Sequence, residues 1–269
     1  MGMDIAGALI GAQPGPRIEI QAWRRVAALA YGALCYGAAL VTLAYAAGWI
    51  GGFLVSRPLD APRQGPLWLA LAVDAGLVLL FAAQHSVMAR PGFKRWWTRL
   101  VPEVAERPTY VLFSCLAMGA MFALWKPIGG VVWDVRDPVW RGAIYGLYAA
   151  GWLLLFAVTF LINHFDLFGL RQVWLHFRGR GYTHLKFGTP GPYRFVRHPL
   201  YVGWLMIFWA APTMTAGHLL FALGTTAYIL LAIRLEERDL VAAHPEYAAY
   251  QARTGMLVPR VRRAGARGG

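Results

Sequence analysis

The side chains of this sequence that could do acid–base or ionic chemistry gather in four short stretches. They lie at residues 84–86, 163–166, 197–199 and 234–238, and they hold histidines, arginines, carboxylates and amides. An imidazole can exchange a proton near neutral pH, and guanidinium and carboxylate groups bind ligands of opposite charge. The four stretches therefore hold candidate site residues, provided that the fold brings them together.

The rest of the chain is far more apolar than a soluble protein. Of its 269 residues 58% are hydrophobic and 14% are charged, whereas soluble domains carry about 25% charged residues. The net charge of +13 would suit a nucleic-acid partner, but basic residues on one face of a bilayer explain it equally well. We therefore predict a membrane protein whose partner is the lipid bilayer, with no nucleic acid and no obligate protein partner.

The apolar runs predict an all-α, polytopic membrane helical bundle. Four runs can cross ~30 Å of hydrocarbon, and they lie at 26–55, 67–89, 109–125 and 142–163. A fifth run, 199–233, would extend roughly 50 Å as one helix, too long for one crossing. Because a proline and a glycine interrupt it at 211–218, we expect a helical hairpin with a short first arm. The prediction is four spans plus a C-terminal helical hairpin, which makes five to six transmembrane segments.

Lysine and arginine set the predicted orientation, because loops on the cytoplasmic side carry an excess of them. With the N-terminus inside, 21 of the 26 basic residues fall in inner segments, and five fall in the outer loops 56–66 and 126–141. This distribution requires the C-terminus to return inside, which a hairpin at 199–233 achieves. Both termini are therefore predicted to be cytoplasmic.

The chain reads as one membrane-embedded domain with short ends. Residues 1–22 are expected to be a partly disordered lead-in, 23–260 the membrane domain, and 261–269 a basic disordered tail. Cys35 and Cys115 lie in apolar runs and are interpreted as small hydrophobes. Histidine and cysteine do not recur with the spacing of zinc ligands, so no metal is expected.

In the predicted orientation the four polar stretches reach the same membrane face. The runs 67–89 and 142–163 end inward, and the hairpin both begins and ends inside. Ionisable groups at membrane depth are costly and usually functional, so we expect a pocket in the inner leaflet. Individual residues also have plainer explanations: His85 and His164 could be interfacial residues, and Asp74 is interpreted as a hydrogen-bonded packing residue. No similar cluster is expected on the outer face.

Two sets of motifs carry a resemblance to known families. The segment GPYRFVRHPLYVG at 191–203, with the later EERDL and HPEYAAYQARTGMLVP, resembles the integral-membrane methyltransferases that include isoprenylcysteine carboxyl methyltransferase and phospholipid methyltransferases. AQHSVMARPGFKRWW, RPTYVL and INHFDLFGLRQVW resemble the methanethiol S-methyltransferase family, bacterial membrane enzymes that make dimethyl sulfide. The second resemblance covers most of 23–260.

The resemblance implies an S-adenosylmethionine site that faces the cytosol of a bacterial inner membrane. Carried over to this chain, the hairpin would supply the cofactor-binding residues Arg197, His198, Tyr201 and Gly203, with the acidic residues Glu236 and Glu237. The side chains of Arg197 and His198 would suit the cofactor's carboxylate. Either Tyr193 or Tyr201 could face its sulfonium through a cation–π contact.

The reaction implied is methylation of a small volatile thiol, methanethiol. A free thiol is largely protonated at neutral pH, so a general base is expected. His164 is our first candidate for the base and His85 the second, because both end inward-running spans. The amides and carboxylate beside them, Gln84, Asn163 and Asp166, are candidate substrate-binding residues.

Two other functions remain open on the sequence. The same hairpin could methylate another acceptor, such as a lipid amine, an isoprenylcysteine-like carboxylate, hydrogen sulfide or a different small thiol. A transporter or a small-molecule sensor belongs to another class, and would place polar groups at mid-membrane and on both faces. The one-sided polar residues disfavour it.

Overall fold

The structure is a computed structural model that describes residues 16–183, 188–243 and 246–260. Helix α1 begins at Pro16, inside the predicted lead-in. The remainder of that lead-in and the predicted tail at 261–269 lie outside the described residues.

Five helices are long and apolar enough to cross a membrane. They are α1 (Pro16–Gly51), α2 (Leu67–Ala89), α4 (Glu103–Leu124), α5 (Pro138–Ile162) and α9 (Ala216–Ala243). The prediction of an all-α, polytopic membrane bundle is confirmed. The shorter helices are α3 (Pro91–Trp97), α6 (His164–Leu167), α7 (Leu170–Phe177), the 3-10 turn η1 (Gly191–Arg194), α8 (Pro199–Trp209) and α10 (Glu246–Arg253).

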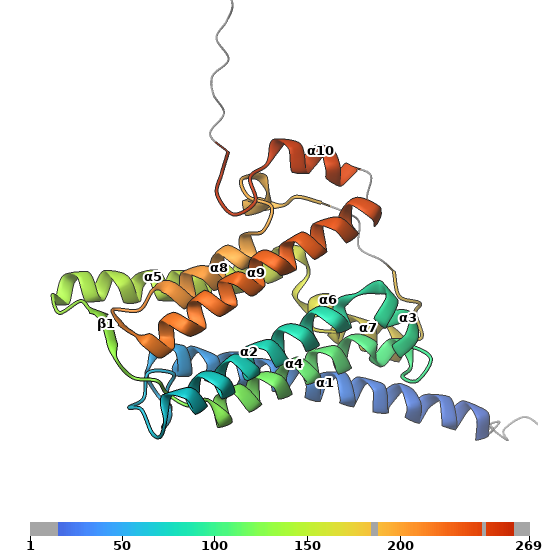
Figure 1. Cartoon of the computed structure of the whole chain (residues 1–269). Coiled ribbons are helices and arrows are strands. Elements are labelled where there is room, and N and C mark those ends of the chain that lie inside the picture. The colour runs from blue at the N-terminus through green and yellow to red at the C-terminus, as the bar shows by residue number, and fades with distance from the viewer. Residues whose placement is uncertain (1–15, 184–187, 244–245, 261–269) are drawn as a thin grey trace, which may run out of the picture.

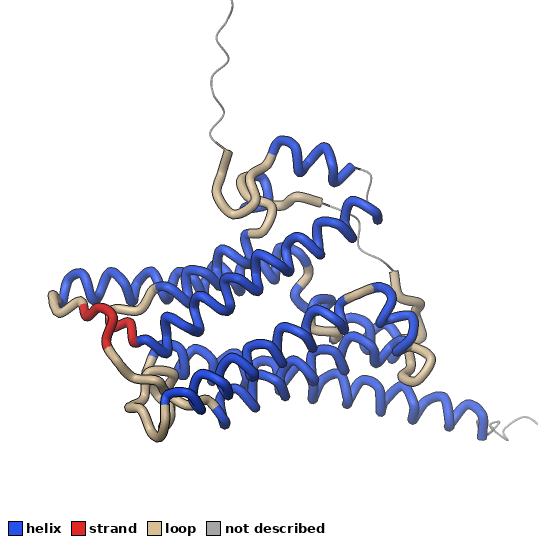
Figure 2. The backbone as a smooth tube through the Cα atoms, in the orientation of Figure 1, coloured by secondary structure: helices blue, strands red, loops and turns tan. Residues whose placement is uncertain are grey.

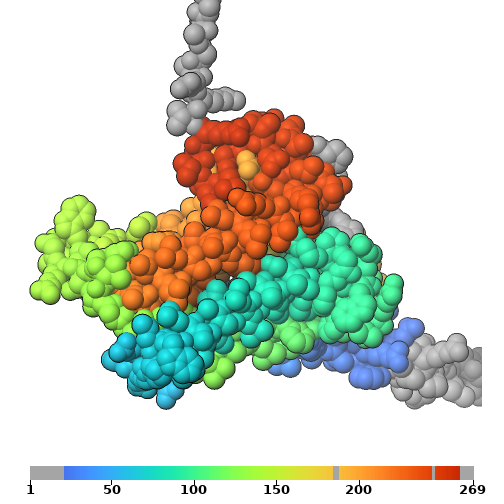
Figure 3. Space-filling model, viewed as in Figure 1, coloured from blue at the N-terminus to red at the C-terminus, as the bar shows by residue number. Residues whose placement is uncertain are grey.

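The long helices form two layers (Figure 1). Helices α1 and α2 both pack against α4 in one layer, whereas α5 and α9 both pack against α8 in the other. Helix α7 packs on α1 and α4 and so belongs to the first layer. The layers meet along the seam between α2 and α9, visible as adjoining blue-green and orange bands in Figure 3.

The C-terminal run folds as the predicted hairpin. Helix α8 has 11 residues and rises only ~16 Å, so it ends well short of a full crossing. The chain continues as strand β2 (Thr213–Thr215), which pairs antiparallel with β1 (Val131–Asp134) from the loop between α4 and α5 (Figure 2). Main-chain hydrogen bonds of this ladder satisfy polar groups that a broken helix would otherwise leave unpaired.

Two ends of the bundle are distinguished below. The basic end holds residues 90–102, 163–183, 188–198, 238–243 and 246–260, and the strand end holds 52–66, 125–137 and 210–215. At the strand end Asp74 is fully buried and accepts the Lys126 backbone N–H at 2.8 Å, in agreement with its predicted packing role.

The strand end also has a polar cluster that the sequence did not predict. The carboxylate of Asp60 lies 2.8 Å from Nδ1 of the buried His218 and accepts the Thr215 hydroxyl. Nε2 of His218 lies 3.0 Å from the Phe208 carbonyl oxygen. Asp60 comes from a loop without hydrophobic periodicity, so its position over α9 could not be anticipated.

Candidate functional site

A cavity of about 280 Å³ lies between the two layers, and we call it the chamber. It is lined by side chains of α1, α2, α4, α5, α8 and α9, together with Leu167 and Phe168 at the basic end. Most of this lining is apolar. Its polar members lie mainly toward the basic end and include His85, Arg107, Tyr110, Ser114, Tyr201 and Tyr228.

Aromatic rings close the chamber toward the strand end, and we call them the aromatic floor. The indole of Trp49 lies 5.2 Å from the ring of Phe122 and 5.5 Å from that of Phe221, centre to centre. Trp125 and Phe208 complete the floor, each within 6 Å of Phe221. Edge-on and tilted ring contacts of this kind are favourable and rigid, so the chamber is blind at this end.

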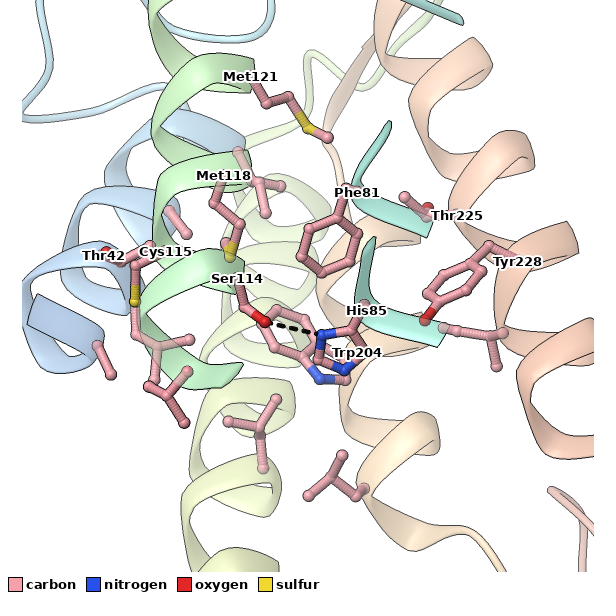
Figure 4. Close-up of a pocket in the computed structure, with 18 of the residues that line it drawn as sticks. Thr42, Phe81, His85, Ser114, Cys115, Met118, Met121, Trp204, Thr225 and Tyr228 are labelled. Atoms are coloured by element: carbon pink, nitrogen blue, oxygen red, sulfur yellow. Dashed lines mark hydrogen bonds between the residues drawn. The ribbon is translucent and has the colours of Figure 1, made fainter. Parts of the chain in front are cut away.

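His85 lines the chamber and is held by two hydrogen bonds. Its Nδ1 lies 3.1 Å from the Ser114 hydroxyl (Figure 4). Its Nε2 lies 2.7 Å from the Tyr110 hydroxyl. The Ser114 hydroxyl is 3.0 Å from the Tyr110 carbonyl oxygen, to which it donates. Its oxygen then accepts Nδ1–H, which leaves Nε2 as the acceptor of the Tyr110 O–H. The His85 ring is thus a neutral base, and its free lone pair on Nε2 accepts the hydroxyl of Tyr110, which also lines the chamber.

His164 lies behind the chamber wall and does not line it. Its Nδ1 is 2.8 Å from the Thr159 hydroxyl, and its Nε2 is 2.9 Å from the Tyr36 hydroxyl. The ring also stacks on Phe160 at 4.2 Å, and burial lowers its pKa. Its hydrogen bonds join α1 and α5 to the start of α6. Because His85 lines the chamber and His164 does not, the geometry favours His85 over His164 as a base.

Glu236 is half-buried beside the chamber-lining Tyr201, at the part of the chamber nearest the basic end, which we call the mouth. Its carboxylate accepts the Tyr201 hydroxyl at 3.2 Å. Burial raises the pKa of Tyr193, and the Glu236 charge raises it further. A half-buried carboxylate with electron-rich rings beside it is a surrounding that attracts a cation.

Glu237, the adjacent residue, is buried in a different network, which we call the clasp. Its Oε1 lies 2.6 Å from Arg197 Nε and 2.9 Å from His198 Nε2, and its Oε2 accepts Gln251 Nε2–H at 2.7 Å. Arg197 also donates to the Thr254 carbonyl at 2.5 Å. The clasp therefore joins the start of α8, the end of α9 and α10 through groups that largely satisfy one another.

The other residues singled out from the sequence lie away from the chamber surface. Gly203 faces α5, where an added Cβ would stand 3.1 Å from the Gly151 carbonyl oxygen. Gln84 donates to Met88 Sδ at 3.2 Å. Asn163, in a left-handed conformation with φ of 104°, caps α6 by accepting the Asp166 backbone N–H. The Asp166 carboxylate pairs with Arg171 at 2.9 Å.

Several chamber residues were missed by sequence reasoning. Tyr110 and Ser114 stand one helical turn apart on α4, inside a run that reads as a plain apolar span. The motif RPTYVL contains Arg107 and Tyr110 at i and i+3, a spacing that places both on one helix face. That spacing was the available signal, and the Arg107 guanidinium does lie 5.1 Å from the centre of the Tyr110 ring.

Comparison with known proteins adds to this geometry. The chain is 53% identical over 236 residues to a protein named methanethiol S-methyltransferase from Crocosphaera subtropica, across 87% of this chain and 92% of the relative. It is 48% identical to a protein of the same name from Mycobacterium tuberculosis, across 88% and 97%. Nurim of Pan troglodytes is 36% identical across 71% and 78%. Neither a protein-family model nor a solved structure matches the chain.

Identities near 50% that extend over almost the whole of both chains are incompatible with a chance or local likeness. The chain belongs to the methanethiol S-methyltransferase family.

Proposed function

We propose that this protein methylates methanethiol to dimethyl sulfide with S-adenosylmethionine as the donor. The reaction would take place at the cytosolic face of a bacterial inner membrane, with both termini in the cytoplasm. The observation that carries the proposal is a base, His85, hydrogen-bonded to a phenol at the wall of an apolar chamber of small volume. The names of the relatives support the acceptor.

The mouth of the chamber fits the donor. S-adenosylmethionine supplies an electrophilic methyl group on a positively charged sulfur. The carboxylate of Glu236 and the ring of Tyr201 would hold that positive charge, because both attract cations in a partly dehydrated setting. Arg197 and His198 are engaged by Glu237, so their role in the proposal is to fix α8 and α9 as the walls of the mouth.

The chain must also take up a proton. Methanethiol would gain the methyl group on its sulfur and lose its S–H proton, since the thiolate is the reactive form. The S–CH₃ bond of the donor would break, and S-adenosylhomocysteine would leave as a neutral thioether. Tyr110 would accept that proton on its oxygen while passing its own proton to Nε2 of His85, 2.7 Å away. Ser114 holds the Nδ1–H of His85 and so keeps Nε2 available. The apolar lining excludes water from the reacting sulfur.

The blind chamber also disfavours a transporter, because the aromatic floor separates it from the strand end.

The whole proposal is tested with purified protein in detergent, given methanethiol and S-adenosylmethionine with a labelled methyl group. Labelled dimethyl sulfide in the headspace is expected. No labelled product at any protein concentration would refute it.

The base assignment predicts opposite results for two histidines. His85→Gln should lower kcat about 10²–10⁴-fold, the usual contribution of a general base, and activity should recover partly as pH rises toward the pKa of the free thiol. His164→Gln should lower thermal stability and leave kcat within a few-fold of wild type, because it removes only the contacts of α6 with α1 and α5. Dimethyl sulfide formation measured from pH 6 to 10 checks both, and wild-type kcat in His85→Gln would remove the assignment.

A further inference from the structure

The part of the chamber between His85 and the aromatic floor has a definite shape and polarity. Ser114, Met118 and Met121 lie on successive turns of α4 and point into the cavity (Figure 4). Seven residues of helix rise ~10 Å, so this part is deep enough for only a short molecule. Both methionine side chains occupy that depth, and the floor ends it.

Three threonine hydroxyls of the chamber lining donate to their own helices. Thr42 donates to the Ala38 carbonyl at 2.7 Å, and Thr225 donates to that of Phe221 at 2.6 Å. Thr159 likewise donates to the Phe156 carbonyl at 2.7 Å. Each hydroxyl has one hydrogen, so these three have none left to offer to a bound molecule.

These features describe a pocket that binds polar acceptors and long acceptors poorly. A buried hydroxyl or charge on the acceptor would lose its water and find no donor among the three threonines. The sulfur atoms of Met118, Met121 and Cys115 add a polarizable, weakly interacting surface. An apolar tail loses nothing on entry.

Resting on the proposed function, we propose that this part of the chamber is the acceptor pocket and that it selects short, apolar alkyl thiols. Met118 and Met121, backed by the aromatic floor, set the chain length. The backbone-bound threonine hydroxyls set the polarity. His85 and Tyr110 stand at the entrance of the pocket, where the thiol sulfur would lie.

The selection against polar acceptors can be tested with the wild-type protein alone. 1-Propanethiol and 2-mercaptoethanol have the same number of heavy atoms and differ by a methyl group against a hydroxyl. With wild-type protein, kcat/KM should be roughly ten- to a hundredfold higher for 1-propanethiol, the range expected for burying an unpaired hydroxyl. Equal values for the two thiols would overturn the proposal and leave the methyltransferase function intact.

The selection by chain length is tested with side-chain truncations on α4. Met118→Ala and Met121→Ala should raise the ratio of kcat/KM for 1-butanethiol to that for methanethiol at least tenfold. Met121→Leu, which keeps the volume, should keep the wild-type ratio. Leu116→Ala is the matched control, because Leu116 is on the same helix but is 58% exposed and does not line the chamber. The proposal fails if both methionine truncations keep the ratio of the control.

A binding measurement separates this inference from the function on which it rests. Thermal unfolding of the wild-type protein in detergent should be shifted upward by 1-propanethiol and not by 2-mercaptoethanol at equal concentration. That result without any thiol methylation would refute the proposed function and keep the pocket. Methylation of methanethiol, together with equal stabilisation by the two thiols, would refute the selective pocket and keep the proposed function.

Discussion

Glu236 and Glu237 are neighbours in sequence with different surroundings in the fold. Adjacent residues on a helix point about 100° apart, so Glu237 enters the clasp while Glu236 remains at the mouth. The motif predicted from sequence that acidic groups belong to the site. It could not predict which of the two is buried, because that depends on where α8 and α10 pack against α9.

The two glutamates predict separable defects. Glu237→Ala leaves the Arg197 guanidinium buried without its carboxylate, so it should lower the free energy of unfolding by about 3 kcal/mol or more. Glu236→Ala should change stability little and instead raise KM for the donor. Thermal unfolding and donor-dependent initial rates distinguish them. Equal loss of stability in both variants would contradict the distinction between clasp and mouth.

His85 and His164 illustrate the same limit of sequence reasoning. Both were predicted to lie at the ends of spans, and the structure has His85 in the last turn and a half of α2 and His164 directly after α5. The sequence ranked His164 first. Its two hydrogen bonds to Tyr36 and Thr159 come from helices whose rotation about their axes is set by packing, which no single run of residues encodes.

At the scale of elements, the hairpin is the best-predicted feature. Its length exceeded one crossing, and its basic ends required a return to the same face. The shortness of α8 was expected, but the ladder of β1 with β2 was not, because three and four residues are too few for a periodic pattern. Gly203 was linked to the cofactor by resemblance, whereas it lies where α8 meets α5.

The contact between α5 and α8 predicts how glycine substitutions behave. A Cβ on Gly203 would stand 3.1–3.3 Å from Gly151 and Leu155, closer than atoms normally pack. Gly203→Ala should therefore cost roughly 1–3 kcal/mol of stability by forcing the helices apart. Gly146→Ala, on α5 with open space around it, should be neutral or slightly stabilising. Unfolding in detergent provides the comparison, and equal effects would exclude close packing as the cause.

At the scale of the molecule, five long helices and the α8–β2 segment amount to six passages between the two ends of the bundle. An even number places the start of α1 and the end of α9 at the same end of the bundle. The sequence predicted a polar pocket at one membrane face, but it could not predict the apolar chamber, which lies between the layers and depends on how α2 and α9 meet.

Orientation in the membrane is a separate prediction. A reporter that is active only in the cytoplasm should be active when it is fused after Arg260, at the basic end. A reporter that is active only in the periplasm should be active when it is inserted at Gly65, at the strand end. The physical reason is the excess of arginine and lysine at the basic end. Reporter activities in intact cells measure it. Activity of the periplasmic reporter at both positions would contradict it.

The placement of the apolar chamber among membrane-crossing helices has a consequence for measured affinities. A thiol that dissolves in hydrocarbon is enriched around the protein, by about fourfold for each added CH₂ at ~0.8 kcal/mol apiece. Apparent Michaelis constants quoted per litre of water should consequently fall along a homologous series until the pocket is full. When the thiol concentration is expressed per volume of lipid, the same Michaelis constants should not change along the series. The bilayer then accounts for the fall in the apparent constants, and the pocket sets the chain length at which the fall ends.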